Sequence, residues 1–257
     1  MSEFVVVSDP RPGVRVIALS RPEKKNALTR AMYDALSAAL RAADADRNVR
    51  VVCLSGSGDA FTAGNDIADF RFGPPPVSNE IGPGGFIAAV AGMEKPVIAA
   101  VNGLAVGIGT TILLHCDLVY AAAGARFQLP FVNLGLVPEA GSTVILPGAF
   151  GRRRASELFL FGEPLNAVTA ERWGLVNAVF PDAELMDRVL ERAEVLATKP
   201  TRVVRLIKHL LTTPAASVRD RAEEELRLLV EQLDAPEARE AMQAFVERRR
   251  PDFSGLV

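Results

Sequence analysis

The chain has 257 residues, of which 49% are hydrophobic and 23% charged, a composition typical of a globular protein with a sizeable core. The formal net charge of −2 gives no overall attraction to nucleic acid or to an anionic membrane. No apolar run reaches the roughly 18 residues of a membrane span, and the N-terminus lacks the pattern of a secretory signal. These features predict a cytoplasmic protein without nucleic-acid or membrane partners.

Cysteine and histidine are scarce. Cys53 and Cys116 lie in apolar runs, which indicates buried free thiols in a reducing compartment rather than a disulfide framework. His115 and His209 are too few for a histidine-based metal site. We therefore expect no metal ion and no separate cofactor.

Residues 1–180 are predicted to alternate strands with helices. An apolar hairpin is expected at 4–20, and residues 28–46 have the spacing of an amphipathic helix with Thr29 as its N-cap. Further strands are predicted at 49–56, 95–103, 125–130 and 174–180, with another beginning near Asp117. Further helices are predicted at 86–94, 139–149, 151–161 and 167–173, and a Pro- and Gly-rich loop at 71–85 is a candidate lid.

The composition changes after Pro181, where helical periodicity runs almost without interruption to residue 250. Repeated strand–loop–helix units imply an α/β fold with helices on the sheet faces. We therefore divide the chain into a core at 1–180 and a helical C-terminal region at 181–257.

Two glycine-rich turns each follow an apolar strand and open a helix: "FTAGND" (61–66) and "LAVGIGTT" (104–111). Glycine lets the backbone approach a ligand closely, and the first N–H groups of a helix have no partner within it. Such turns suit a phosphate or an oxyanion that forms during a reaction. Neither turn matches the dinucleotide fingerprint, and neither is followed by a P-loop lysine.

Glu139 stands out among the carboxylates because it lies in the apolar, glycine-rich stretch "FVNLGLVPEAGST" (131–143). One interpretation places it in the first turn of a helix after Pro138, facing water and complementing the helix dipole. The other makes it a proton carrier whose pKa is raised by apolar surroundings. No nucleophile elbow is present, so the candidate acid–base groups are Asp59, Asp66, Asp69, Glu80, Glu94 and Glu139.

Several stretches together resemble the crotonase (enoyl-CoA hydratase/isomerase) superfamily, in family order over nearly the whole chain. They are "RPEKKNALTRAM", "SGSGDAFTAGNDIADF", "KPVIAAVNGLAVGIGTTILLHCDLVYA", "FQLPFVNLGLVPEAGST", "GEPLNAVTAERWGLVNAVFP" and "ERRRPDF". The resemblance implies a spiral core of ββα repeats and an α-helical C-terminal region that packs in trimers or pairs of trimers. It also implies an acyl-CoA thioester as substrate.

By resemblance, the oxyanion hole consists of the backbone N–H groups of Asn65 and Ile108. The expected substrate-binding residues are Lys25, Ala27, Ala63, Gly64, Asn65, Asp66, Ile67, Leu104, Gly107, Ile108, Thr111, Phe131 and Leu136. Phe61 and Phe70 are further candidates for the acyl channel, and Arg248 near Phe253 would reach CoA from the tail of a neighbouring subunit.

The departures from the family pattern favour one reaction. The two glutamates of family hydratases are replaced here by Thr111 and Phe131, whereas Glu139 matches the single glutamate of a "PE" turn in the Δ3,Δ2-enoyl-CoA isomerases. This predicts an isomerase that moves the double bond of a 3-enoyl-CoA to the 2-position, with Glu139 as its only acid/base. A hydratase-like or other crotonase-type reaction, and a non-catalytic acyl-CoA-binding role, remain alternatives.

Overall fold

The structure is a computed structural model that describes residues 3–73 and 78–256, without the side chains of residues 70–72. The predicted loop at 71–85 and the side chain of Phe70 therefore lie partly outside the described residues. No helix within the described residues is long and apolar enough to cross a membrane.

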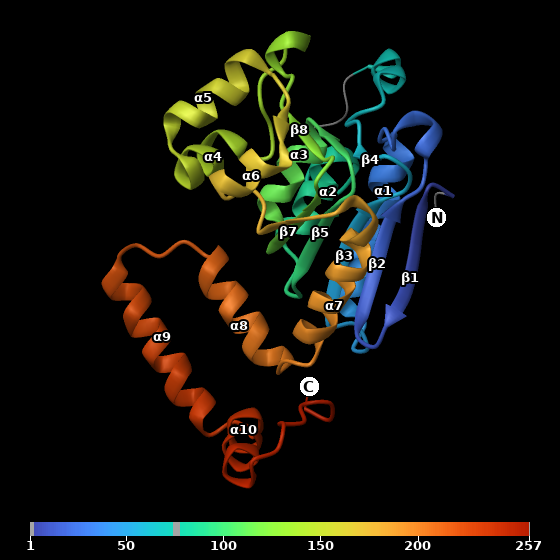
Figure 1. Cartoon of the computed structure of the whole chain (residues 1–257). Coiled ribbons are helices and arrows are strands. Elements are labelled where there is room, and N and C mark those ends of the chain that lie inside the picture. Colours follow the sequence, from blue (N-terminus) through green and yellow to red (C-terminus); the bar gives the residue numbers. More distant parts are fainter. Residues whose placement is uncertain (1–2, 74–77, 257) are drawn as a thin grey trace.

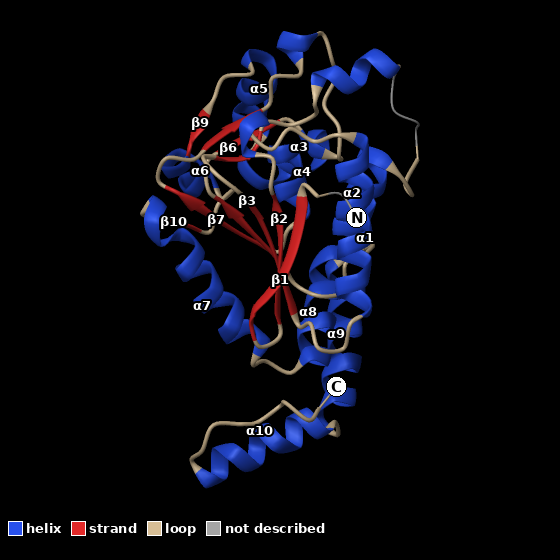
Figure 2. Cartoon of the chain, turned by 90° about the vertical axis from the view of Figure 1, so that its right-hand side faces the viewer, coloured by secondary structure: helices blue, strands red, loops and turns tan. Residues whose placement is uncertain are grey.

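A large sheet forms the centre of the molecule (Figures 1 and 2). Its first two strands, β1 (Val5–Arg11) and β2 (Val14–Leu19), form the predicted antiparallel hairpin. From β2 onward neighbouring strands are parallel, in the order β2, β3 (Val51–Gly56), β5 (Val97–Val101), β7 (Leu118–Ala122) and β10 (Ala178–Phe180). β3 and β5 are buried along almost their whole length, as their largely apolar sequences predict.

A smaller sheet continues from the carboxyl ends of the large one. Its strands are β4 (Ala60–Thr62), β6 (Leu104–Val106), β8 (Arg126–Gln128) and β9 (Leu165–Asn166). β3 leads into β4, β5 into β6 and β7 into β8, and helical segments follow each pair. This is the predicted ββα repeat. The sequence analysis assigned β4 and β6 to glycine turns, because three-residue strands are too short to show an alternating pattern.

Two helical layers enclose the large sheet (Figure 2). α1 (Arg30–Ala45) packs against β1, β2 and α2 (Gly82–Ala91), and α7 (Leu185–Ala197) packs across β2, β3, β5 and β7. Thr29 is the N-cap of α1, as predicted, and accepts a hydrogen bond from Met32 N at 3.3 Å. The single-turn 3-10 helices are Pro22–Lys24, Ile67–Phe72, Ile112–His115, Val132–Leu134 and Asp182–Glu184.

The remaining core helices lie beside the smaller sheet. They are α3 (Ile108–Thr111), α4 (Ser142–Phe150), α5 (Arg152–Phe161) and α6 (Ala167–Trp173). The predicted helix at 139–149 begins only at Ser142. Ala140 and Gly141 have φ values of 56° and 67°, so this turn is left-handed and cannot belong to a right-handed helix.

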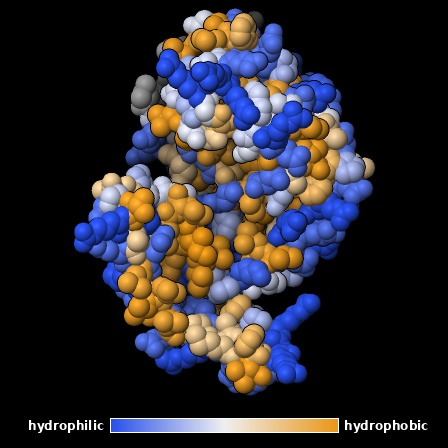
Figure 3. Space-filling model, turned by 60° about the vertical axis from the view of Figure 1, so that its left-hand side comes forward, coloured by the Kyte–Doolittle hydropathy of each residue, from blue (hydrophilic) through white to orange (hydrophobic). Residues whose placement is uncertain are grey.

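The last three helices form an arm that projects from the core (Figure 1): α8 (Thr201–Thr212), α9 (Val218–Leu233) and α10 (Pro236–Glu247). Apolar side chains gather on this arm (Figure 3). Its largely exposed apolar residues include Leu211, Leu226, Leu229, Val230, Phe245 and Val246. The chain end returns to the core, where Arg50 donates to the carbonyls of Phe253 and Ser254.

Candidate active site

The smaller sheet brings the two glycine turns together. β4 and β6 run parallel, with Thr62 opposite Ala105. Asn65 and Ile108 each lie three residues beyond that pair, so the two turns emerge side by side at the carboxyl ends of neighbouring strands. The contact is close, because a Cβ atom on Gly64 would lie only 2.8 Å from the Val106 carbonyl oxygen. Only glycine fits this approach at the positive φ of 87°.

Hydrogen bonding orients the Asn65 N–H. Leu28 N donates to the Gly64 carbonyl at 2.8 Å, and Asp66 N donates to Leu28 O at 2.9 Å. The Gly64 carbonyl and the Asn65 N–H belong to one trans peptide plane and point in opposite directions. The Asn65 N–H therefore points away from Leu28, and no acceptor for it is found among the described residues.

The same geometry recurs in the second turn. Gly107 O accepts hydrogen bonds from Thr110 N and Thr111 N, both at 2.9 Å, so the Ile108 N–H points out of the start of α3. This N–H also lacks an acceptor within the described residues. Gly107 has φ 55° and ψ −117°, a conformation that residues with a Cβ rarely adopt. Two amide donors in adjacent turns can together bind an oxygen that gains negative charge.

Glu139 lies between Pro138 and α4, and its turn is held by several contacts. Ser142 donates to the Glu139 carbonyl from both its N–H and its hydroxyl, at 3.1 and 2.6 Å. His115 Nε2 donates to Ala140 O at 2.8 Å, which requires the proton on that nitrogen. The left-handed conformation of Ala140, which L-residues adopt at a cost, is thus maintained by its neighbours.

The carboxyl group of Glu139 is turned inward, against the second glycine turn. It is half-buried and accepts a hydrogen bond from the hydroxyl of Thr111, a fully buried residue of α3. Burial raises the pKa of Glu139 above its ordinary value of 4.5, and the Thr111 hydrogen bond opposes this with a smaller effect. The interpretation of Glu139 as a water-facing residue of a first helical turn is therefore wrong.

By resemblance, Phe131 and Thr111 occupy the positions at which family hydratases carry their two glutamates. Both residues lie in the interior. Phe131 is 9% exposed and Thr111 is fully buried. Neither adds a carboxylate beside Glu139.

The predicted CoA-binding loop lies next to the first turn. Ala63 N donates to Lys25 O at 2.9 Å, and the buried side chain of Asn26 donates to the carbonyls of Ser57 and Ala60. The ammonium group of Lys25 is exposed and forms an ion pair with Asp59. Ala27 is half-buried, and its carbonyl accepts from Arg21.

The other predicted substrate contacts differ in exposure. The Asp66 carboxylate forms an ion pair with Arg21 at 2.6 Å, and this pairing lowers its pKa. Ile67 and Leu136 are 71% and 51% exposed, whereas Leu104 is half-buried and Phe61 is buried. The roles of these residues toward a substrate stay predictions.

Tyr33 is the residue that the sequence analysis missed. It lies on the buried face of α1, and its hydroxyl donates to Asn65 Oδ1 at 2.6 Å. Helical spacing from Leu36 could have placed Tyr33 in the core. Nothing in the sequence indicates where its hydroxyl points.

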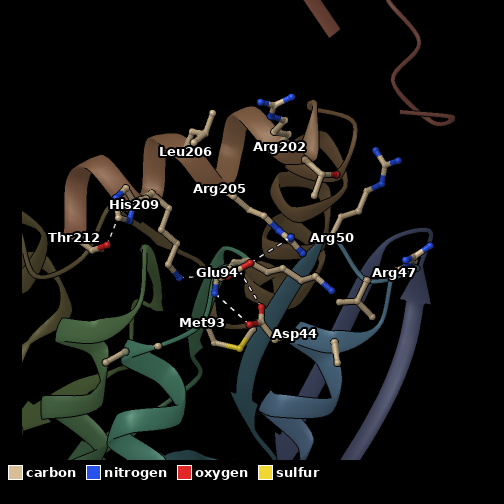
Figure 4. A pocket seen from close by; sticks show the side chains of 17 residues that line it. Asp44, Arg47, Arg50, Met93, Glu94, Arg202, Arg205, Leu206, His209 and Thr212 are labelled. Carbon is tan, nitrogen blue, oxygen red and sulfur yellow. Dashed lines mark hydrogen bonds and ion pairs between the residues drawn. The ribbon is translucent and has the colours of Figure 1, made fainter. Parts of the chain in front are cut away.

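A large cavity lies away from this site. It has a volume of about 900 Å³ and lies between α8 and the amino ends of β3 and β5 (Figure 4). Most of its charged lining residues are basic, and one of them, Arg205, forms an ion pair with Glu94 at 3.3 Å. A much smaller pocket lies beside the first glycine turn, between Tyr33, Asn65, Asp69 and Pro83. Among the described residues, no cluster of His, Cys, Asp and Glu side chains could hold a metal ion.

Comparison with solved structures establishes the class of fold. A structure from Magnetospirillum magneticum AMB-1, described as an enoyl-CoA hydratase/carnithine racemase, superposes with a TM-score of 0.94 at 46% sequence identity. The match covers 99% of this chain and all of that one. The crotonase-type α/β fold predicted from the sequence is thereby confirmed.

Sequence comparisons agree with the fold. The Enoyl-CoA hydratase/isomerase family model matches residues 10–255. The chain is 35% identical to the 1,2-epoxyphenylacetyl-CoA isomerase of Escherichia coli K12, over 99% of this chain and all of that protein. It is also 36% identical to human enoyl-CoA delta isomerase 2, over 81% of this chain and 54% of that protein. The chain belongs to the enoyl-CoA hydratase/isomerase family and is an enzyme of that family.

Proposed function

We propose that this enzyme is an isomerase that converts a 3-enoyl-CoA into the 2-enoyl-CoA, with Glu139 as its single acid/base. The observation that carries the proposal is the position of Glu139. Its carboxyl group points inward and accepts a hydrogen bond from Thr111 of α3, the helix that begins at Ile108. One proton carrier therefore contacts the helix that begins at Ile108, and the N–H groups of Asn65 and Ile108 have no acceptor within the described residues. The family relationship supports an acyl-CoA substrate, and the thioester itself requires no separate cofactor.

The reaction follows from these groups. The ionised Glu139 removes a proton from C2, and the thioester oxygen gains negative charge as the dienolate forms. The N–H groups of Asn65 and Ile108 stabilise this oxygen, each by about 3 kcal/mol in comparable sites. Glu139 then returns the proton to C4, so that the double bond lies between C2 and C3 and no atom is gained or lost.

The Thr111 hydroxyl fixes the base during this transfer. It donates to Oε1 of Glu139, while no partner for Oε2 is found among the described residues. Oε2 is therefore the oxygen available to the substrate. Because the pKa of Glu139 is raised, its ionised form is a stronger base. Its basicity is therefore closer to that of the substrate carbon from which it removes the proton.

Hydration of a 2-enoyl-CoA is the alternative reaction, since hydratases and isomerases share this family. Adding water by the family route uses two carboxylates, and the corresponding positions here carry Thr111 and Phe131. The buried Phe131 ring instead favours a site without an activated water. The lone carboxylate thus supports isomerisation over hydration.

We also propose that the chain assembles as a homotrimer or a dimer of trimers through its C-terminal arm. Leu211, Phe245 and Val246 are each at least 80% exposed, and such apolar residues are stabilised by burial against a partner. Light scattering coupled to size exclusion would measure three or six chains. A monomer at micromolar concentration would contradict the proposal.

The reaction is tested with two substrates and two variants. Wild-type protein should convert trans-3-hexenoyl-CoA into the conjugated trans-2-hexenoyl-CoA, detected by the absorbance of the conjugated thioester, and should hydrate trans-2-hexenoyl-CoA only slowly. Glu139→Gln should lower kcat for the first reaction by about 10³-fold, within the range of general acid–base groups. Glu163→Gln, at an exposed glutamate, is the control. Rapid hydration, or full isomerase activity in Glu139→Gln, would refute the proposal.

A further inference from the structure

One buried side chain contacts the first glycine turn from behind. Tyr33 is 2% exposed, and its hydroxyl donates to Asn65 Oδ1 at 2.6 Å. Asn65 itself is exposed, in the turn that presents the free N–H. The hydrogen bond therefore links the rigid helix α1 to the residue that carries one of the two amide donors.

The position of the Tyr33 ring is well determined. Its backbone lies in the first turns of α1, which Thr29 caps. The ring packs at a tilt against Phe86 of α2, with centroids 5.9 Å apart. Since aromatic side chains have only two rotatable bonds, this packing delivers the hydroxyl to one place.

The Tyr33 hydroxyl is a hydrogen-bond donor at neutral pH. Burial, together with the negative charges of Glu139 and Asp69, raises its pKa well above the usual value of 10. The hydroxyl thus keeps its proton at neutral pH. Asn65 Oδ1 accepts this hydrogen bond, which orients the carboxamide.

The turn needs such an anchor because of Gly64. Glycine has the widest torsional freedom, and Gly64 directly precedes the Asn65 N–H at φ 87°. Leu28 holds the peptide plane through the Gly64 carbonyl, and Tyr33 holds the side chain of Asn65, the residue that carries the N–H. Both anchors come from one segment, the start of α1 and the residues just before it.

We propose that Tyr33 is a positioning residue that fixes the oxyanion donor at Asn65; the inference rests on the proposed function. Tyr33 does not touch the substrate. Its hydroxyl restrains Asn65, so that the N–H meets the thioester oxygen as charge develops.

The experiment compares Tyr33→Phe with Ser37→Ala. Ser37 lies one turn further along the buried face of α1, and its hydroxyl donates to Tyr33 O at 2.8 Å. Each variant therefore loses one hydroxyl from the same helix, but only the first loses the bond to Asn65. Tyr33→Phe should lower kcat about tenfold and should leave KM within about twofold of wild type. This loss is smaller than the 10²- to 10³-fold decrease expected when an oxyanion donor is removed entirely. Ser37→Ala should keep kcat.

A second readout does not need turnover. Bound hexanoyl-CoA carrying ¹³C at the thioester carbonyl reports polarisation by the two N–H groups, as a shift of the carbonyl stretch to lower frequency. This shift should shrink in Tyr33→Phe and persist in Ser37→Ala. Asn65→Ala keeps the backbone N–H but removes the acceptor of the Tyr33 hydrogen bond. Its kcat and its carbonyl shift should therefore match those of Tyr33→Phe. The double variant should show no larger loss of either quantity than the single variants.

The outcomes separate the two proposals. The role of Tyr33 would be refuted if the carbonyl shift were unchanged in Tyr33→Phe. It would also be refuted if the loss of kcat in the double variant were the product of the losses in the two single variants. No polarised carbonyl in wild type would refute the oxyanion hole and the inference with it. A polarised carbonyl that depends on Tyr33, without isomerisation of trans-3-hexenoyl-CoA, would support the inference and refute only the proposed reaction.

Discussion

At the amino ends of β5 and β7, the buried ammonium groups of Lys95 and Lys208 both have hydrogen-bond partners. Lys208 of α8 donates to Lys95 O at 2.9 Å and to Asp117 at 2.7 Å, while Asp117 also accepts from Val97 N. At the carboxyl ends, beyond the smaller sheet, the situation is reversed. The N–H groups of Asn65 and Ile108 lack acceptors among the described residues, and Glu139 has one hydroxyl partner.

The difference shows how the two ends divide their tasks. Removing one partner of a buried ion pair is costly for folding, because the other charge is left uncompensated. Unpaired donors and a carboxylate with a raised pKa are unfavourable in the free enzyme, but they are available to a substrate. We therefore expect substitutions at the amino ends to change stability and substitutions at the carboxyl ends to change activity.

Among the substitutions that compare the two ends of the sheet, Gly64→Ala should have the largest effect on activity. The added Cβ would lie 2.8 Å from Val106 O, which would force the two glycine turns apart. We expect kcat/KM to fall by about 10²-fold or more, as when an oxyanion donor is lost. Gly174→Ala is the control, because Gly174 has the same φ of 87° with open space around it. Equal losses of activity in the two variants would mean that backbone strain alone is responsible.

Lys208→Met should have the opposite signature. It leaves the Asp117 carboxylate without its cation, so the free energy of unfolding in urea should fall by about 3 kcal/mol. The kcat of the remaining folded enzyme should be unchanged. Lys199→Met, at an exposed lysine, should alter neither quantity. A large loss of kcat without a loss of stability would contradict the division between the two ends.

Thr111→Val should have a smaller effect on activity. The Thr111 hydrogen bond lowers the pKa of Glu139, so its loss should raise that pKa further and shift the rising limb of the pH–rate profile to higher pH. We expect kcat at neutral pH to fall about threefold to tenfold, because the base is also less well oriented. Thr110→Val removes the neighbouring buried hydroxyl, which bonds to Ala105 O instead. A profile that shifts equally in both variants would rule out a specific Thr111–Glu139 interaction.

The smallest effect is on the pH dependence of stability. Because folding raises the pKa of Glu139, its contribution to stability is present below pH 4.5 and is lost as pH rises through the folded value. Glu139→Gln should therefore have a higher Tm than wild type at neutral pH. The difference should vanish on acidification toward pH 4.5. A Gln variant that is less stable at neutral pH would show that the carboxylate is well solvated or paired.

The order of elements, the two glycine turns and the family could all be predicted from the sequence alone. The N-cap at Thr29, the hairpin and the apolar runs of β3 and β5 are local signals. They can be recognised from neighbouring residues, without knowledge of distant contacts. The motifs also pointed to Asn65, Ile108 and Glu139 as candidates. Their proximity to one another was implied only by the resemblance.

Tertiary structure decided what each group can do. Whether Glu139 faced water or the interior depended on the left-handed turn at Ala140 and on Thr111, 28 residues away in sequence. The contact between Tyr33 and Asn65, 32 residues apart, likewise requires α1 to pack beside the first glycine turn. The pKa of a carboxyl group and the direction of a hydroxyl depend on such long-range neighbours, because burial and hydrogen bonding act through space rather than along the chain.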